Sequence, residues 1–84
     1  MHNKTILTEI KPSFNKYGWV CSDDEEHSYF FTKRMKQFRI NVNKRSIDIT
    51  IPLKYSHELY STSFDNYYDA SEYILMHLDY QELK

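Results

Sequence analysis

The chain has 84 residues, a formal net charge of −1, 40% hydrophobic residues and 27% charged residues. This length predicts a single small globular domain over residues 1–84, since domains need about 50–250 residues, and the composition excludes wholesale disorder. The near-zero charge excludes a protein that coats nucleic acid by bulk electrostatics alone, and no segment approaches the roughly 20 apolar residues of a membrane span.

Two residue types occur only once in the chain, and each single occurrence excludes certain kinds of functional site. The lone Cys21 excludes a disulfide framework and a cysteine-based zinc site, which fits a cytoplasmic protein. The lone Gly18 excludes glycine-rich phosphate-binding loops, so we expect no cofactor. Abundant Ile, Asn, Lys and Tyr are typical of AT-rich coding sequences, as in phages, viruses and low-GC bacteria, and a viral protein would act in the host-cell cytoplasm.

The N-terminal segment predicts a helix over residues 3–17. Its apolar residues recur on one helical face, and Gly18 follows as a C-terminal cap. Pro12 should kink or split this helix, because its ring clashes with the carbonyl four residues earlier. An alternating strand over Thr5–Lys11 is the alternative. The residues that form the apolar face are Ile6, Leu7, Ile10 and Phe14.

Four strands are predicted next. The first spans 18–22, an acidic loop follows at Asp23–Glu26, and the second strand spans roughly 28–33. The third and fourth form a hairpin around Lys44-Arg45, because apolar residues alternate with polar ones on both sides of this dipeptide. The pairs that this register predicts are Val42 with Ile47, Ile40 with Ile49, and Phe38 with Ile51, and Pro52 ends the fourth strand.

A second tight turn is predicted near Arg34-Met35. It sets Phe31 opposite Phe38 and Tyr29 opposite Ile40, so that all four side chains share the apolar face of the sheet. The same register places Phe30 on the polar face, directly across from Arg39.

The C-terminal part predicts a polar connection over 53–64, which allows a short extended piece, and a helix from about Asn66 to Leu83. Ser63 or Asp65 is the expected N-cap. The expected buried stripe of this helix is Tyr67, Ala70, Ile74 and Leu78. The predicted fold is therefore α+β, in the order α-β-β-β-β-α, with one antiparallel sheet of three to four strands and both helices on one face.

Enzymatic chemistry is not expected. The four histidines (His2, His27, His57 and His77) lack metal-ligand spacing, and Cys21 is expected to be a small buried hydrophobe on the apolar side of its strand. The carboxylates of 23–26 form one contiguous run, whereas acid–base catalysis needs two carboxylates in different environments. We therefore expect no catalytic residue and no metal site.

Charge is segregated along the chain. Residues 33–54 hold seven Lys or Arg against one Asp, whereas residues 55–84 hold six Asp or Glu against one Lys. Six of the eight tyrosines fall between residues 55 and 80. Neither pattern needs a function to explain it. The charges can simply keep the surface of a soluble protein solvated, and the tyrosines can complete a thin core with their hydroxyls at its rim.

We favour a non-enzymatic protein-binding module, such as an inhibitor or accessory protein encoded by a phage or virus. Its C-terminal helix would dock on a basic groove of a partner protein, where carboxylates steer the encounter, an apolar and aromatic centre provides affinity, and the helix mimics nucleic acid. The expected partner-binding residues are Asp69, Glu72, Tyr73, Met76, Asp79 and Tyr80.

The alternative function is binding of single-stranded RNA or DNA on the outer face of the sheet. Bases would stack on Phe30, and the surrounding cations would contact phosphates. The expected residues are Phe30, Arg34, Lys36, Arg39, Lys44 and Arg45. No feature of the sequence indicates an oligomeric state.

Overall fold

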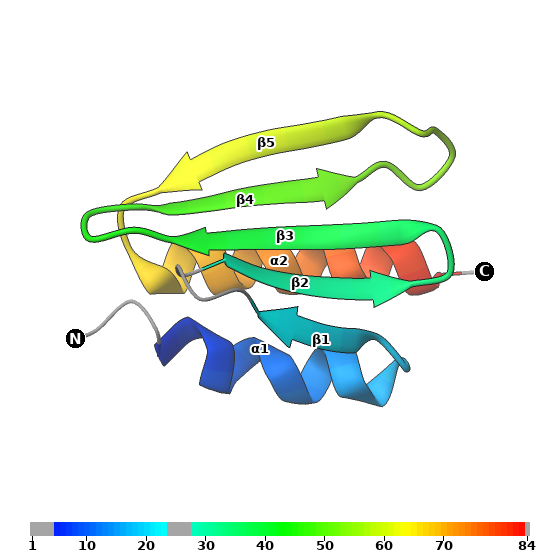
Figure 1. The fold of residues 1–84 in the computed structure, drawn as a ribbon, viewed down its shortest axis with the longest axis horizontal. Helices are drawn as coiled ribbons and strands as arrows, with labels where there is room; N and C mark the ends of the chain where they lie inside the picture. Colours follow the sequence, from blue (N-terminus) through cyan, green and yellow to red (C-terminus); the bar gives the residue numbers. More distant parts are fainter. Residues whose placement is uncertain (1–4, 24–27, 84) are drawn as a thin grey trace.

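Two helices and five strands make up the computed structural model, which describes residues 5–23 and 28–83 (Figure 1). No helix in these ranges is long and apolar enough to cross a membrane. In chain order the elements are α1 (Thr5–Lys16), β1 (Val20–Asp23), β2 (Ser28–Lys33), β3 (Lys36–Val42), β4 (Ile47–Pro52), β5 (Leu59–Phe64) and α2 (Tyr67–Glu82).

The strands form one antiparallel sheet in the order β1-β2-β3-β4-β5, so each strand lies beside its neighbours in the chain. Both helices contact each other and lie on one side of the sheet (Figure 1). This arrangement confirms the predicted α+β class. The predicted count of three to four strands is wrong, because the segment expected to be a connection contains β5. Of the predicted acidic loop, only Asp23 lies inside the described residues.

The fifth strand lacks the apolar alternation on which strand prediction depends. Its sequence LYSTSF is mostly exposed, and it pairs with β4 through backbone hydrogen bonds and hydroxyl contacts. The Ser63 hydroxyl donates to Asp48 Oδ1 at 2.6 Å, and the hydroxyls of Thr50 and Ser61 are 2.9 Å apart. Backbone pairing with an already formed β4 therefore holds β5 in place, and its own hydrophobic pattern does not.

Helix α1 runs through Pro12 without a break, so the predicted split and the alternative strand over Thr5–Lys11 are both wrong. Pro12 is exposed and removes only the hydrogen bond to the carbonyl of the exposed residue Thr8, which water can satisfy. The buried residues Ile10 and Phe14 anchor the helix on either side of the proline.

Gly18 ends α1 as predicted. Its φ of +86° is left-handed, its N–H donates to the Asn15 carbonyl at 3.1 Å, and the Trp19 N–H donates to the Phe14 carbonyl at 3.0 Å. This pair of bonds is a Schellman motif, and the Phe14–Trp19 ring contact supplies its hydrophobic closure. Because Gly18 and Trp19 belong to this cap, β1 begins at Val20 and not at residue 18.

The predicted register of the hairpin between β2 and β3, with its turn at Arg34-Met35, is confirmed. Phe31 pairs with Phe38, Tyr29 with Ile40, and Phe30 with Arg39. Arg34 has a φ of +57°, a left-handed conformation that is uncommon for residues other than glycine. Burial of the paired apolar residues outweighs this local strain.

The hairpin between β3 and β4 follows its predicted register near the turn. Val42 pairs with Ile47 and Ile40 with Ile49, and the Asn43 N–H donates to the Ser46 carbonyl at 2.8 Å. The paired ladder ends at Arg39 and Thr50, one step before the predicted Phe38–Ile51 pair.

Pro52 explains where that ladder ends. Hydrogen-bonded pairs alternate along an antiparallel ladder, so the bonded pair after Arg39–Thr50 would join Gln37 to Pro52, which has no N–H to donate. Beside this position the Lys36 ammonium donates to the carbonyls of Leu53 and Ser56.

The core centres on an aromatic cluster beneath the sheet. Phe14 of α1 stacks on Phe31 with ring centroids 4.0 Å apart, and it meets Phe38 edge-on at 5.1 Å. Trp19 contacts Phe38 edge-on at 5.1 Å. The predicted apolar face of α1 is confirmed, since every residue in it is buried. The buried hydrophobic residues are Ile6, Leu7, Ile10, Phe14, Trp19, Phe31, Phe38, Ile40, Val42, Ile47, Ile49, Ile51, Ala70, Ile74 and Leu78.

We predict that Phe14→Ala lowers the free energy of unfolding by about 3–5 kcal/mol, because it leaves a cavity against two phenylalanine rings. Urea denaturation followed by far-UV circular dichroism measures this loss. The exposed neighbour Asn15 supplies the control, since Asn15→Ala should change the stability by less than about 0.5 kcal/mol. A loss below about 1 kcal/mol for Phe14→Ala would contradict its central role in the core.

Candidate functional site

Helix α2 positions the predicted partner-binding residues. The Asn66 side chain caps the helix by accepting a hydrogen bond from the Asp69 N–H at 2.9 Å, and its amide donates to Asp69 Oδ2 at 2.9 Å. The predicted N-caps, Ser63 and Asp65, are therefore wrong. Ser63 lies inside β5, where its hydroxyl bonds to β4, and Asp65 precedes the residue that has the capping geometry.

The buried stripe of α2 decides which residues remain outside. Ala70, Ile74 and Leu78 are fully buried, as predicted, whereas Tyr67 is only partly buried against the core. Residues on the opposite side of a helix with a single buried stripe must face solvent. The pKa of Tyr67 is raised to about 12, first because of a hydrogen bond with Tyr68 and then because of burial.

The aromatic residues of the predicted site lie on the side of α2 nearest β5 and the loop before it. The Tyr73 ring is 5.1 Å from that of Phe64 and 4.4 Å from that of His77. Tyr80 is 48% exposed, and the Lys54 ammonium lies 4.9 Å from its ring centroid. Burial raises the pKa of the Tyr73 hydroxyl and lowers that of His77.

Two of the three predicted carboxylates, Glu72 and Asp79, occupy the other side of the same helix. Asp79 is exposed and accepts a hydrogen bond at 3.3 Å from the hydroxyl of Tyr17, the residue that follows α1. Glu72, also exposed, stands seven residues earlier, which places it two turns away on the same side. The exposed Met76 stands between the two groups. Asp69, in the first turn, precedes Tyr73 by four residues and Met76 by seven, so it lies on the aromatic side. The tertiary structure thus divides the predicted face into an acidic side and an aromatic side.

A mainly apolar groove borders the aromatic side. It lies between the C-terminal half of α2 and the end of β4, with a volume of about 310 Å³. The Gln81 amide of α2 donates to the Pro52 carbonyl of β4 at 2.6 Å, which links the two elements directly. The residues that line the groove are Ile51, Pro52, Leu53, Lys54, Met76, His77, Tyr80 and Gln81.

Glu82 fastens the end of α2 to the sheet, a role that helical periodicity alone does not reveal. It accepts hydrogen bonds from Trp19 Nε1 at 2.7 Å and from Lys33 Nζ at 3.0 Å. Burial by itself would raise the pKa of this carboxyl, but the bonds from Lys33 and Trp19, with the charges of Lys33 and Arg34, lower it below its ordinary value of 4.5. Three side chains far apart in sequence, those of Trp19, Lys33 and Glu82, thus meet at one end of the molecule.

We predict that Glu82→Gln is less stable than the wild type at neutral pH and that this difference disappears in acid. A carboxyl whose pKa is depressed by folding stabilises the folded state above its unfolded pKa of 4.5. That contribution is lost as the pH falls through the lower, folded value. Urea denaturation at several pH values between about 3 and 7 measures the effect. Glu72→Gln, on the exposed side of the same helix, is the control, and an equal loss of stability in both variants would contradict this role of Glu82.

The six residues predicted to contact nucleic acid lie in three places. Phe30 and Arg39 meet in the middle of the outer face, with the guanidinium 5.4 Å from the ring centroid. Arg34 is in the turn between β2 and β3, and Lys36 beside it donates to loop carbonyls. Lys44 and Arg45 form the turn at the opposite end of the sheet. The structure therefore brings together Phe30 with Arg39 but spreads the other cations.

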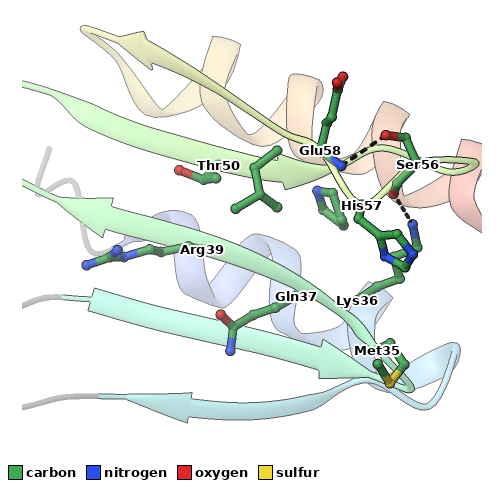
Figure 2. A pocket seen from close by; sticks show the side chains of 10 residues that line it. Met35, Lys36, Gln37, Arg39, Thr50, Ser56, His57 and Glu58 are labelled. Carbon is green, nitrogen blue, oxygen red and sulfur yellow. Dashed lines mark hydrogen bonds between the residues drawn. The ribbon is translucent and has the colours of Figure 1, made fainter.

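A shallow hollow of about 240 Å³ occupies the outer face where β3 and β4 separate (Figure 2). Gln37 and Arg39 project from the sheet, and Ser56, His57 and Glu58 of the loop border them. The loop is held by the Glu58 N–H, which donates to the Ser56 hydroxyl at 3.0 Å, and by Lys36. This hollow adds two further polar side chains, Gln37 and His57, to the surroundings of Arg39.

Within residues 5–23 and 28–83, no group of three or more His, Cys, Asp or Glu is placed to hold a metal ion. Cys21 is half-buried on β1, opposite Phe31, and packs against the core. His2 and His27 lie outside the described residues. Comparison with known protein families, with curated proteins and with solved structures found no match to this chain.

Proposed function

We propose that this protein is a non-enzymatic binding module that docks the exposed face of α2 on a basic groove of a partner protein. The observation that carries the proposal is that Met76 and Tyr80 remain 58% and 48% exposed while the stripe behind them is fully buried. The core thus holds the helix in place and leaves the Met76 and Tyr80 side chains available for contact with a partner. We place this activity in the cytoplasm, which suits the single cysteine.

The two sides of α2 have different roles in this proposal. Met76 and Tyr80, next to the apolar groove, provide most of the affinity, since aromatic residues beside pockets dominate protein interfaces. Glu72 and Asp79 line the acidic side and speed the approach of a positively charged partner. A protein groove that normally holds nucleic acid is such a partner, because the carboxylates take the places of phosphates. An inhibitor or accessory protein of a phage or virus would work in this way.

We predict that the double variant Met76→Ala/Tyr80→Ala weakens partner binding at least about 30-fold, equivalent to the 2 kcal/mol typical of a binding hot spot. Partners captured from cell extract by the wild type, with nuclease present, are identified by mass spectrometry and their affinities are then measured. Met35→Ala/Tyr55→Ala is the matched control, because it removes the same residue types from exposed positions elsewhere. A double variant that binds every wild-type partner with unchanged affinity would remove the proposal.

The acidic side has its own expected effect. Glu72→Gln/Asp79→Asn should slow association with the partner and reduce its salt dependence, while the dissociation rate changes little, because exposed charges act mainly on the encounter. Surface plasmon resonance at low and moderate salt measures both rates. An unchanged association rate would show that these carboxylates do not steer binding.

Single-stranded nucleic acid is the second proposed ligand, and the Arg39–Phe30 contact on the open face of the sheet favours it. We rank it lower because the remaining cations are spread and Lys36 and Lys33 have partners within the protein. If the face binds single strands, Phe30→Ala/Arg39→Ala should abolish a gel shift seen at about 50 mM salt, where counterion release makes binding strong. A wild-type chain that shifts no oligonucleotide under these conditions excludes this ligand.

A further inference from the structure

The outer edge of β5 has no neighbouring strand in the described part of the chain. Among the described residues, β5 pairs only with β4, and it forms the border of the sheet farthest from α1 (Figure 1). The backbone groups of an edge strand that point away from the sheet can pair with another extended chain.

The hydrogen-bond phase identifies these outward groups. The Leu53 N–H donates to the Glu58 carbonyl at 3.2 Å, and these two residues continue the register of the β4–β5 ladder. Because bonded pairs alternate, the groups that face β4 belong to residues 60, 62 and 64. The N–H and C=O groups of Leu59, Ser61 and Ser63 therefore point outward from the sheet.

The usual protections of an edge strand are missing from β5. Residues 59–64 contain no charged residue and no proline, and Leu59 and Tyr60 are 65% and 57% exposed. Natural edges normally avoid pairing through charges, prolines or short length. The other edge strand, β1, has only four residues and lies beside α1.

The α2 side chain that contacts β5 is uncharged as well. The side chains of β5 on the helix-covered face are Tyr60, Thr62 and Phe64, and the Phe64 ring contacts that of Tyr73 of α2. The carboxylates Glu72 and Asp79 are on the far side of that helix. With a chain net charge of only −1, little long-range repulsion opposes a second copy.

We propose that β5 is a self-association edge, through which two copies of this chain join their sheets about a two-fold axis. The occupant we assign is a second copy because an uncharged strand offers a charged partner nothing to recognise, whereas an identical strand run antiparallel satisfies the same outward groups. In that pairing residues on the same face meet, so Ser61 lies opposite Ser61 or Ser63 of the other copy. This edge consists of the backbone of β5, whereas the surface proposed above is formed by side chains of α2.

Sedimentation velocity over a wide range of protein concentration tests the proposal. We expect the wild type to reach twice the 10.3 kDa mass of the chain. Ser61→Pro removes one outward N–H without removing a hydrogen bond to β4, and proline is tolerated on edge strands, so this variant should remain at the monomer mass. Ser61→Ala is the matched control, which loses the hydroxyl contact with Thr50 but keeps the backbone donor, and it should dimerise like the wild type.

Ser61→Lys provides a second measurement that does not change the backbone. A lysine in the middle of the edge should raise the dissociation constant of the dimer at least about ten-fold, because an edge lysine must be desolvated when a strand is added. Far-UV circular dichroism confirms that each variant is folded. A wild type that remains monomeric at every concentration overturns the proposal, as does a dimer that persists in both Ser61→Pro and Ser61→Lys. Loss of the dimer in Ser61→Ala would also overturn it, since a side chain and not the strand edge would then join the copies.

Discussion

Burial of a single apolar sheet face beneath two helices is the constraint on which the rest of this structure depends. Phe14 is central to this packing, because its ring stacks on Phe31 and contacts Phe38. Its carbonyl also accepts the hydrogen bond from the Trp19 N–H in the Schellman motif that ends α1. A domain of 84 residues buries a smaller fraction of its unfolded chain's surface than a larger domain does, so one aromatic cluster carries much of its stability. Every exposed surface of the protein is defined by what this burial leaves outside.

The consequence for α2 is a helix with three environments around its circumference. Ala70, Ile74 and Leu78 face the core. Tyr73 and Tyr80 lie toward β5 and the groove, whereas Asp79, with Glu72 on the same side, bonds to Tyr17 at the end of α1. Rings and charges that lie close together in the sequence therefore serve different surfaces. This separation is the physical basis for assigning partner affinity to one side of the helix and electrostatic steering to the other.

The sheet presents a similar contrast between its borders. At the β1 border a short strand lies beside α1, whereas β5 is a longer, uncharged strand whose outward backbone groups lack a partner among the described residues. Some polar side chains on the outer face bond to one another across strands, as Asp48 does with Ser63. Capacity for further pairing is thus concentrated in the backbone of one edge.

Local patterns determined most of the fold from the sequence. Alternation of apolar residues set both predicted registers, since a slip of one residue would have turned the isoleucines of the slipped strand to solvent. The helical spacing of Ile6, Ile10 and Phe14 defined the buried face of α1. The acidic and aromatic residues of the candidate site were also recognisable in the sequence, because helical spacing alone separates Met76 and Tyr80 from the buried stripe.

Only the tertiary structure decided the features that depend on contact between distant segments. β5 exists because β4 offers it a backbone ladder, which no pattern within LYSTSF encodes. Glu82 acquires its altered pKa from Trp19 and Lys33, which lie on other elements. The division of α2 into an aromatic and an acidic side likewise follows from which neighbour each side meets. Periodicity reports whether a residue is buried, but the identity of its neighbours comes from how the helices and strands pack together.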